Sequence, residues 1–263
     1  MEKSLSFKNT KIAYRDYGKG SVVVLLHGFL ENSTMWNNLI PEISKTNRVL
    51  TIDLLGHGNT GCLGYIHSMG LMAEAVFAVL KSLRIRKTTL IGHSMGGYVS
   101  LAFAENHPTM IKGLCLMNST SLADEEDRKK LRARANKMVQ NNFKNMVRMS
   151  FTNLFSEESR TLFKPEMELA LTEALKTPVQ GYIACQEGMR IRPNRTRVLS
   201  ENSFKKLIII GKKDPVLTFE EALEEVEKTN SEVIIFDDGH MSHIENKEAL
   251  IIALKDFIKS CKK

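Results

Sequence analysis

The sequence predicts an α/β protein: a mostly parallel eight-stranded sheet flanked by helices, with a helical insertion. Apolar, β-branched runs, typical of strands buried on both faces, alternate with stretches of helical spacing. This alternation stops near residue 120, gives way to helical patterns alone, and resumes after residue 200. Strand–helix alternation is typical of a parallel sheet with helices on both faces, so the middle of the chain reads as a separate helical unit.

The eight expected strands are short and follow one another in a regular order. Six lie in the first part of the chain: SLSF, KIAYRDY, SVVVLLHG, RVLTID, KTTLIGH and IKGLCLM. A helix is expected over HSMGLMAEAVFAVLKSL, between the fourth and fifth strands. The last two strands are expected at 205–211 and 231–237, with helices at 218–228 and 246–260. We therefore divide the chain into a core, residues 1–119 and 201–263, and a helical insertion, residues 120–200.

The composition is that of an ordinary globular protein. The chain has 263 residues, of which 43% are hydrophobic and 25% charged. No apolar run reaches the roughly 18 residues that cross a bilayer, and the polar N-terminus predicts neither a secretory signal nor a membrane association. The four cysteines are scattered and form no C-x-x-C pair, which predicts no zinc site, no disulfide framework and a cytoplasmic location.

The net charge of +7 raises the question of an acidic partner. The densest charged run, residues 123–137, places acids in the first turn of a helix and pairs Glu125 with Lys129 and Glu126 with Lys130 at i,i+4 spacing. Such pairing predicts a solvated helix face. We therefore expect no nucleic-acid partner.

One serine stands at a strand-to-helix junction. The motif Gly92-x-Ser94-x-Gly96 lies between the strand KTTLIGH and a helical stretch. In this pattern a sharp turn holds the serine in a strained backbone conformation above the sheet, and glycines avoid collisions with nearby backbone. The following helix N-terminus leaves backbone N–H groups free to stabilise negative charge. The pattern predicts Ser94 as a nucleophile rather than part of an ordinary turn.

A serine nucleophile needs a base, and the base needs an acid to orient it. The strand at 231–237 leads into DGHMSHIEN, where His240 is the preferred base because it follows the strand end closely; His243 is the alternative. The strand at 205–211 leads into GKKDPVL, which places Asp214 at the same sheet edge. The order Ser94, Asp214, His240 is the chain order of a known catalytic triad.

These motifs together resemble the α/β-hydrolase family over nearly the whole chain. The segments that carry the resemblance are LLHGFLENSTMW (25–36), DLLGHG (53–58), IGHSMGG (91–97), GKKDP (211–215) and GHMSHIEN (239–246). The resemblance implies an oxyanion hole made by the backbone N–H groups of Phe29 and Met95, supports His240 as the base, and identifies residues 120–200 as a helical cap. One departure is Thr60, where the family often has serine.

A second glycine motif resembles a dinucleotide-binding site but lacks the elements that such a site needs. GHGNTG (56–61) fits the dinucleotide-binding pattern G-x-G-x-x-G, but no helix is expected to open inside it and no acid ends the next strand. No metal-ligand cluster is apparent either. We therefore expect neither a cofactor nor a metal.

The resemblance predicts a carboxylesterase-like serine hydrolase that cleaves small, fairly apolar esters through an acyl-enzyme. A C–C bond or lactone hydrolase with the same triad is the alternative, as is a signalling receptor that keeps the triad but acts by binding. Six apolar cap residues are candidates either to line an acyl pocket or to form the cap's own core: Phe143, Met146, Met149, Phe151, Phe155 and Phe163. The sequence identifies no substrate-binding residue, and it leaves the physiological substrate and the oligomeric state open.

Overall fold

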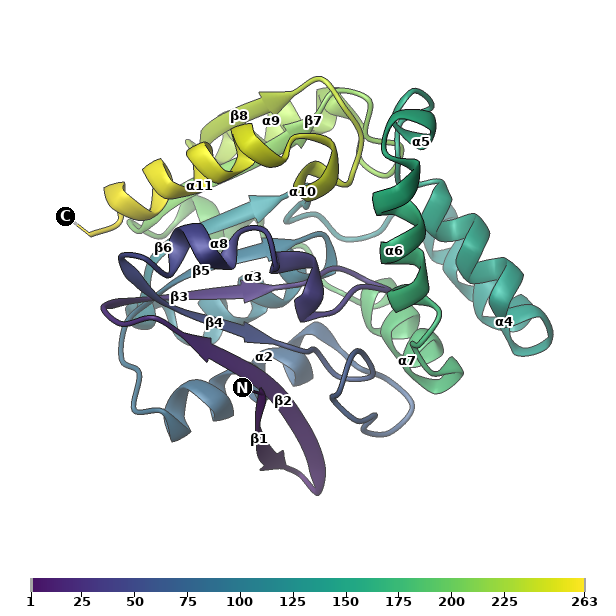
Figure 1. Cartoon of the computed structure of the whole chain (residues 1–263), viewed down its shortest axis with the longest axis horizontal. Helices are drawn as coiled ribbons and strands as arrows, with labels where there is room; N and C mark the ends of the chain where they lie inside the picture. Colours follow the sequence, from purple (N-terminus) through teal and green to yellow (C-terminus); the bar gives the residue numbers. More distant parts are fainter. Residues whose placement is uncertain (1, 263) are drawn as a thin grey trace.

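A single eight-stranded sheet forms the centre of the computed structural model, which describes residues 2–262 (Figure 1). The strands are β1 (Glu2–Phe7), β2 (Thr10–Tyr17), β3 (Ser21–Leu26), β4 (Asn47–Ile52), β5 (Thr88–His93), β6 (Ile111–Met117), β7 (Lys205–Gly211) and β8 (Glu232–Phe236). They are ordered β1-β2-β4-β3-β5-β6-β7-β8. All eight strands expected from the sequence are present, which confirms the predicted fold class.

The pairing explains why distant segments meet at one edge. The first two strands are antiparallel to their neighbours, whereas β4, β3 and β5 to β8 run parallel. The register pairs Leu26 with Gly92 and His93 with Met117, so these strand ends lie level. Since parallel strands all end on the same side, the loops after β3, β5, β6, β7 and β8 gather there.

Helices cover both faces of the sheet, as the two-sided burial of its strands requires. On one face lie α2 (Met69–Ser82), α3 (Met95–Asn106) and α9 (Phe219–Thr229). On the other lie α1 (Ile40–Ile43) and α11 (Lys247–Ser260). Alternate residues of β3 serve the two faces: Val24 and Leu26 pack in the first core, and Val23 and Leu25 in the second.

In chain order the helical insertion lies between β6 and β7, and Figure 1 shows α4 to α7, in teal and green, at one side of the sheet. It comprises α4 (Glu126–Thr152), α5 (Ser159–Leu162), α6 (Lys164–Ala174), α7 (Val179–Arg190) and α8 (Thr196–Ser200). The remaining short helices are η1 (Ser33–Trp36), η2 (Pro108–Met110) and α10 (Ser242–Glu245). Within residues 2–262, no helix is long and apolar enough to cross a membrane.

The helical insertion shares a small apolar core with loops of the sheet domain. Met146, Phe151 and Phe155 are buried in it together with Leu30 and Met241 from loops of the sheet domain. Phe143 and Phe163 are only partly buried. Met149 does not belong to this core, because its side chain is 54% exposed. The helical insertion therefore packs directly on loops that follow the parallel strands.

The charged run at the start of α4 forms a solvated face, but with different partners from those expected. Lys129 pairs with Glu126 and Lys130 with Asp127, at i,i+3 rather than i,i+4 spacing. The helix begins at Glu126, so Glu125 is its N-cap and lies outside the first turn. Both pairs are exposed, and exposed pairs contribute little to stability.

Candidate active site

The parallel strands bring the three predicted catalytic side chains to one edge of the sheet. Ser94 directly follows β5, Asp214 lies in the loop after β7, and His240 lies in the loop after β8. Residues separated by more than 100 positions in the sequence thus share one region, as the common direction of the strands requires.

Ser94 occupies a strained turn, as the sequence motif predicts. Its φ of 48° and ψ of −114° lie outside the regions that a serine readily adopts. The backbone is held on both sides: Ser94 N donates to Met117 O at 3.0 Å, and Ser119 Oγ donates to Ser94 O at 2.7 Å. A side chain on Gly96 would overlap the backbone oxygen of Leu26, which confirms why glycine is needed there.

His240 and Asp214 are hydrogen-bonded and buried. His240 Nδ1 lies 2.7 Å from Asp214 Oδ2, and Asp214 Oδ1 accepts from the backbone N–H of Val216 at 2.8 Å and of Leu217 at 3.2 Å. Burial alone would raise the pKa of Asp214, but the charge and hydrogen bond of His240 outweigh it and lower that pKa. Because the carboxylate only accepts, Nδ1 carries the proton and Nε2 is left as the basic nitrogen.

Ser94 and His240 are connected through His93, the residue directly before Ser94. His93 Nε2 lies 2.9 Å from His240 O, and the two imidazole rings are 5.1 Å apart. The hydrogen bonds formed by residues 2–262 do not include one from Ser94 Oγ to the His240 ring. Such a bond is commonly long before substrate binds, so the Ser94–His240 step stays a prediction.

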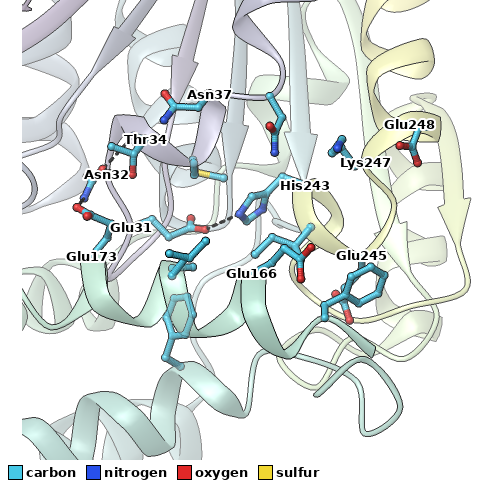
Figure 2. Close-up of a pocket in the computed structure, with 17 residues that line it drawn as sticks. Glu31, Asn32, Thr34, Asn37, Glu166, Glu173, His243, Glu245, Lys247 and Glu248 are labelled. Atoms are coloured by element: carbon cyan, nitrogen blue, oxygen red, sulfur yellow. Dashed lines mark hydrogen bonds and ion pairs between the residues drawn. The ribbon is translucent and has the colours of Figure 1, made fainter. Parts of the chain in front are cut away.

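His243, the alternative base, faces a different part of the molecule. Its Nε2 lies 3.5 Å from Glu31 Oε1, and its Nδ1 has no hydrogen-bond partner among the described residues. Burial lowers the pKa of His243 to about 4. Figure 2 shows His243 and Glu31 side by side in a cleft of about 720 Å³, whose lining includes neither Ser94 nor His240. The geometry favours His240 as the base.

Both predicted oxyanion donors belong to segments that lie next to Ser94. Met95 is the first residue of α3, so its N–H is one of the free donors of a helix N-terminus. Phe29 lies in the loop after β3, and the loop approaches Ser94 closely: a Cβ on Gly28 would lie 3.2 Å from Ser94 Cβ. Among residues 2–262, neither Phe29 N nor Met95 N has a hydrogen-bond acceptor. Both amides are therefore available to an oxyanion.

Side chains fix the backbone around Phe29. His27 Nδ1 donates to Gly28 O at 2.8 Å, and Leu30 N donates to His57 Nε2 at 3.1 Å. Burial lowers the pKa of His57 to about 3, so its Nε2 stays an acceptor at neutral pH. His57 lies in the glycine motif GHGNTG (56–61). No helix begins inside this motif, as expected, because α2 begins at Met69.

Sequence reasoning missed several residues that organise this site. Asn118 follows β6 and adopts a left-handed φ of 45°; its amide donates to Asp214 Oδ2 at 3.2 Å, and its Oδ1 accepts from Ser242 Oγ at 2.6 Å. The signal was a polar residue directly after a buried strand. Glu245 accepts from the backbone N–H groups of Gly239 and Met241, on both sides of His240. Only the folded chain shows these contacts.

A model of the alpha/beta hydrolase fold matches residues 21–247 of this chain. The protein belongs to the α/β-hydrolase fold family. This confirms the resemblance that the sequence motifs indicated. A solved esterase from Thermogutta terrifontis, with malate bound, is 26% identical to this α/β hydrolase and superposes with a TM-score of 0.93 over 100% of both chains.

Curated relatives divide into partial and nearly full-length matches. Uncharacterized proteins of Mycobacterium bovis and Mycobacterium tuberculosis are 34% identical over 107 residues, which span 41% of this chain but only 31% of theirs. The 3-oxoadipate enol-lactonase 1 of Acinetobacter baylyi is 28% identical over 229 residues, covering 86% of this chain and 84% of the lactonase. Esterases, lactonases and C–C bond hydrolases all occur among the neighbours of this α/β hydrolase.

Proposed function

We propose that this α/β hydrolase is a serine carboxylesterase that cleaves small, fairly apolar esters through an acyl-enzyme. The observation that carries the proposal is the 2.7 Å hydrogen bond between His240 Nδ1 and Asp214 Oδ2, at the sheet edge where the strained Ser94 turn lies. A buried carboxylate–imidazole pair beside a partly buried serine is the arrangement that activates a serine nucleophile.

The first half of the reaction acylates the serine. Ser94 Oγ attacks the ester carbonyl carbon while His240 Nε2 takes the hydroxyl proton, and Asp214 stabilises the imidazolium that forms. The carbonyl oxygen becomes an oxyanion, which accepts hydrogen bonds from Phe29 N–H and Met95 N–H. Each such donor lowers the barrier by about 3 kcal/mol. His240 then protonates the leaving alcohol, and the bond from carbon to that oxygen breaks.

The second half releases the acid by the same route. Water enters beside His240, which takes one of its protons as the oxygen attacks the acyl carbon. The same two amides hold the second oxyanion. Collapse of this intermediate returns the proton to Ser94 Oγ and frees the carboxylic acid, so that neither a metal nor a cofactor takes part.

The aromatic surroundings of Phe29 support an apolar substrate. The Phe29 and Tyr182 rings are 5.0 Å apart at 64°, and Phe143 packs edge-on to Tyr182 at 6.3 Å. Tyr182 and Phe143 come from the segment 120–200, which we assign as the cap. An aromatic wall from the cap beside an oxyanion donor favours an ester with a short apolar acyl group over a charged one.

Lactones form a second candidate class because they are cyclic esters. The enol-lactonase of Acinetobacter baylyi covers most of this chain, and ring opening uses the same serine, base and oxyanion donors. The difference is that the leaving alcohol stays attached to the acyl-enzyme until water releases it.

We also assign the protein to the cytoplasm. All four cysteines are unpaired, and three of them, Cys115, Cys185 and Cys261, are buried thiols. Burial raises the pKa of Cys115 and Cys185, which keeps these thiols protonated and unreactive. Unpaired thiols of this kind fit a reducing compartment.

The test is a panel of p-nitrophenyl esters from acetate to palmitate, together with simple γ- and δ-lactones. We expect kcat/KM to peak at short or medium acyl chains and to fall for long ones, with no effect of a chelator. Preference for long emulsified lipids, or inhibition by the chelator, would refute the proposal. Turnover no faster than once per hour on every compound would favour the receptor alternative.

A further inference from the structure

A buried carboxylate and a buried histidine outside the proposed triad connect three of its loops. Glu31 lies in the loop after β3, and His93 ends β5 directly before Ser94. His93 Nδ1 lies 2.6 Å from Glu31 Oε2, and the two side chains are 1% and 5% exposed. Neither residue has a role in the proposed reaction, so their burial at this position needs an explanation.

The hydrogen bonds of the pair run to two parts of the proposed machinery. Glu31 Oε2 also accepts from Gly28 N at 2.8 Å, and His93 Nε2 contacts His240 O at 2.9 Å. Gly28 is wedged against both: a Cβ there would lie 2.5 Å from Glu31 Oε2 and 2.7 Å from His93 Nδ1. These hydrogen bonds connect the loop after β3 to the end of β5, and the end of β5 to the backbone of His240.

The bonding pattern fixes the protonation of His93. One ring nitrogen faces a carboxylate oxygen that already accepts from Gly28, and the other faces a carbonyl oxygen. Both partners are acceptors, whereas a neutral imidazole has one donor only. With Glu31 ionised, both nitrogens carry protons, and His93 is an imidazolium paired with the Glu31 carboxylate.

The charges around the pair agree with this assignment. Burial alone would lower the pKa of His93, but the Glu31 charge outweighs it and raises that pKa. Burial opposes ionisation of Glu31, yet the charge and hydrogen bond of His93 lower its pKa to about 2. The other titratable groups that act on the pair are His27, His240, His243 and Asp214, and His243 stays neutral.

The pair bears on the direction of the Phe29 N–H bond. Gly28 O and Phe29 N belong to one planar peptide unit. His27 holds Gly28 O on one side, and Glu31 holds Gly28 N on the other. With both neighbouring groups fixed, the Phe29 N–H keeps one orientation before an oxyanion forms, which is what preorganised electrostatic stabilisation requires.

Resting on the esterase function proposed above, we propose that Glu31 and a doubly protonated His93 are positioning residues, which aim the Phe29 amide and hold the His240 backbone relative to Ser94. Neither residue touches the substrate. Their loss misplaces an oxyanion donor, and misplacement by about 1 Å costs on the order of 100-fold in rate.

The experiment compares Glu31→Gln, His93→Gln and the double variant with the wild type on p-nitrophenyl butyrate. A glutamine at position 31 has no charge to keep His93 doubly protonated. One of its ring nitrogens would then carry no proton and would face an oxygen without a hydrogen bond. We expect each single variant to lose about 10- to 100-fold in kcat with KM changed less than about threefold. The double variant should lose no more than the worse single one, because the pair acts as a unit.

Asp16→Asn is the matched control. Asp16 on β2 is a carboxylate that is 11% exposed and lies 2.9 Å from Arg48; it pairs with Leu50 inside the β2–β4 ladder and belongs to none of the loops that carry the site. It should keep the wild-type kcat. A wild type without any esterase activity refutes the proposed function, whereas an active wild type with Glu31→Gln at full kcat refutes only the positioning role.

A second measurement does not need a folded variant of Glu31. In ¹⁵N-histidine-labelled wild type at pH 7.5, the ring nitrogens of His93, identified by their loss in His93→Gln or by their coupling to the His240 carbonyl, should both carry protons. A neutral His93 at that pH overturns the proposal, whatever the kinetics show.

Discussion

At the scale of single residues, His240 and His243 differ in what faces each ring. His240 Nδ1 is bonded to Asp214, whereas His243 faces Glu31 at 3.5 Å and its Nδ1 has no partner within residues 2–262. His240 and His243 thus differ in chemistry. The Asp214 carboxylate at Nδ1 orients His240 as a base, whereas burial without a carboxylate at Nδ1 keeps the His243 imidazole neutral.

This difference predicts unequal effects of two substitutions. His240→Ala should lower kcat by about 10³-fold or more, since triad members act as a unit. His243→Ala should lower kcat far less, although it opens a cavity and reduces stability. Steady-state kinetics on p-nitrophenyl butyrate checks the ranking, with circular dichroism as the folding control. The reverse ranking would make His243 the base.

At the scale of elements, the turn between β5 and α3 depends on contact with β3. A Cβ on Gly96 would overlap the backbone oxygen of Leu26, the last residue of β3. The strand cannot move aside, because it pairs with β4 on one edge and β5 on the other. The conformation of Ser94 therefore depends on the packing of a helix start against a central strand.

We expect Gly96→Ala to lower the free energy of unfolding by about 3 kcal/mol or more, or to prevent folding. Gly70→Ala, near the start of α2, is the matched control: its Cβ would meet only Ser68 Oγ, at 3.9 Å, and it should raise the free energy of unfolding by about 0.5 kcal/mol. Urea denaturation measures both. A Gly96→Ala protein as stable as the wild type would contradict this account of the turn.

The elements and the predicted site followed from the sequence because their signals are local. Each signal can be read within a few residues: an apolar strand run, the glycines around Ser94, or an acid or histidine that follows a strand end. Glu31 and His93 carried no such signal, and the local signal of Asn118, a polar residue directly after a buried strand, did not show what its side chain binds. Glu31 meets His93 62 positions away, and Asn118 meets Ser242 124 positions away, so only the folded register reveals what they hold.

At the scale of the whole molecule, the helical insertion is bonded to the loop that carries the proposed base. The backbone N–H of His240 donates to Leu154 O of the cap at 3.0 Å, and Glu245 Oε1 accepts from Ser156 N. His240, the proposed base, is therefore attached to the helical insertion as well as to the sheet. Displacing the cap would displace His240.

Buried neutral histidines distributed over the molecule set its acid stability. Burial lowers the pKa of His67 to about 4 from an ordinary value of 6.5. Above pH 6.5 His67 is neutral in both folded and unfolded chains. As the pH falls below 6.5 the unfolded chain takes up a proton that the folded one does not, so stability declines until about pH 4. The lost stabilisation is roughly 3 kcal/mol.

We expect the urea-unfolding free energy of the wild type to fall between pH 6.5 and pH 4. His67→Gln, whose amide oxygen can still accept from Leu63 N, should show a slope smaller by the equivalent of one proton. Unfolding curves at pH 7, 6 and 5 measure both slopes. Equal slopes for the two proteins would show that His67 is not a neutral buried group.

The central claim is that Ser94 is the nucleophile of an ester hydrolase. The most direct measurement is mass spectrometry of the protein after reaction with a fluorophosphonate, which traps an activated serine as a covalent adduct. We predict one adduct per chain, mapped to the peptide that contains Ser94, complete loss of esterase activity in proportion to labelling, and no adduct on Ser94→Ala. An adduct on another residue, or an active enzyme that stays unlabelled, would contradict the account.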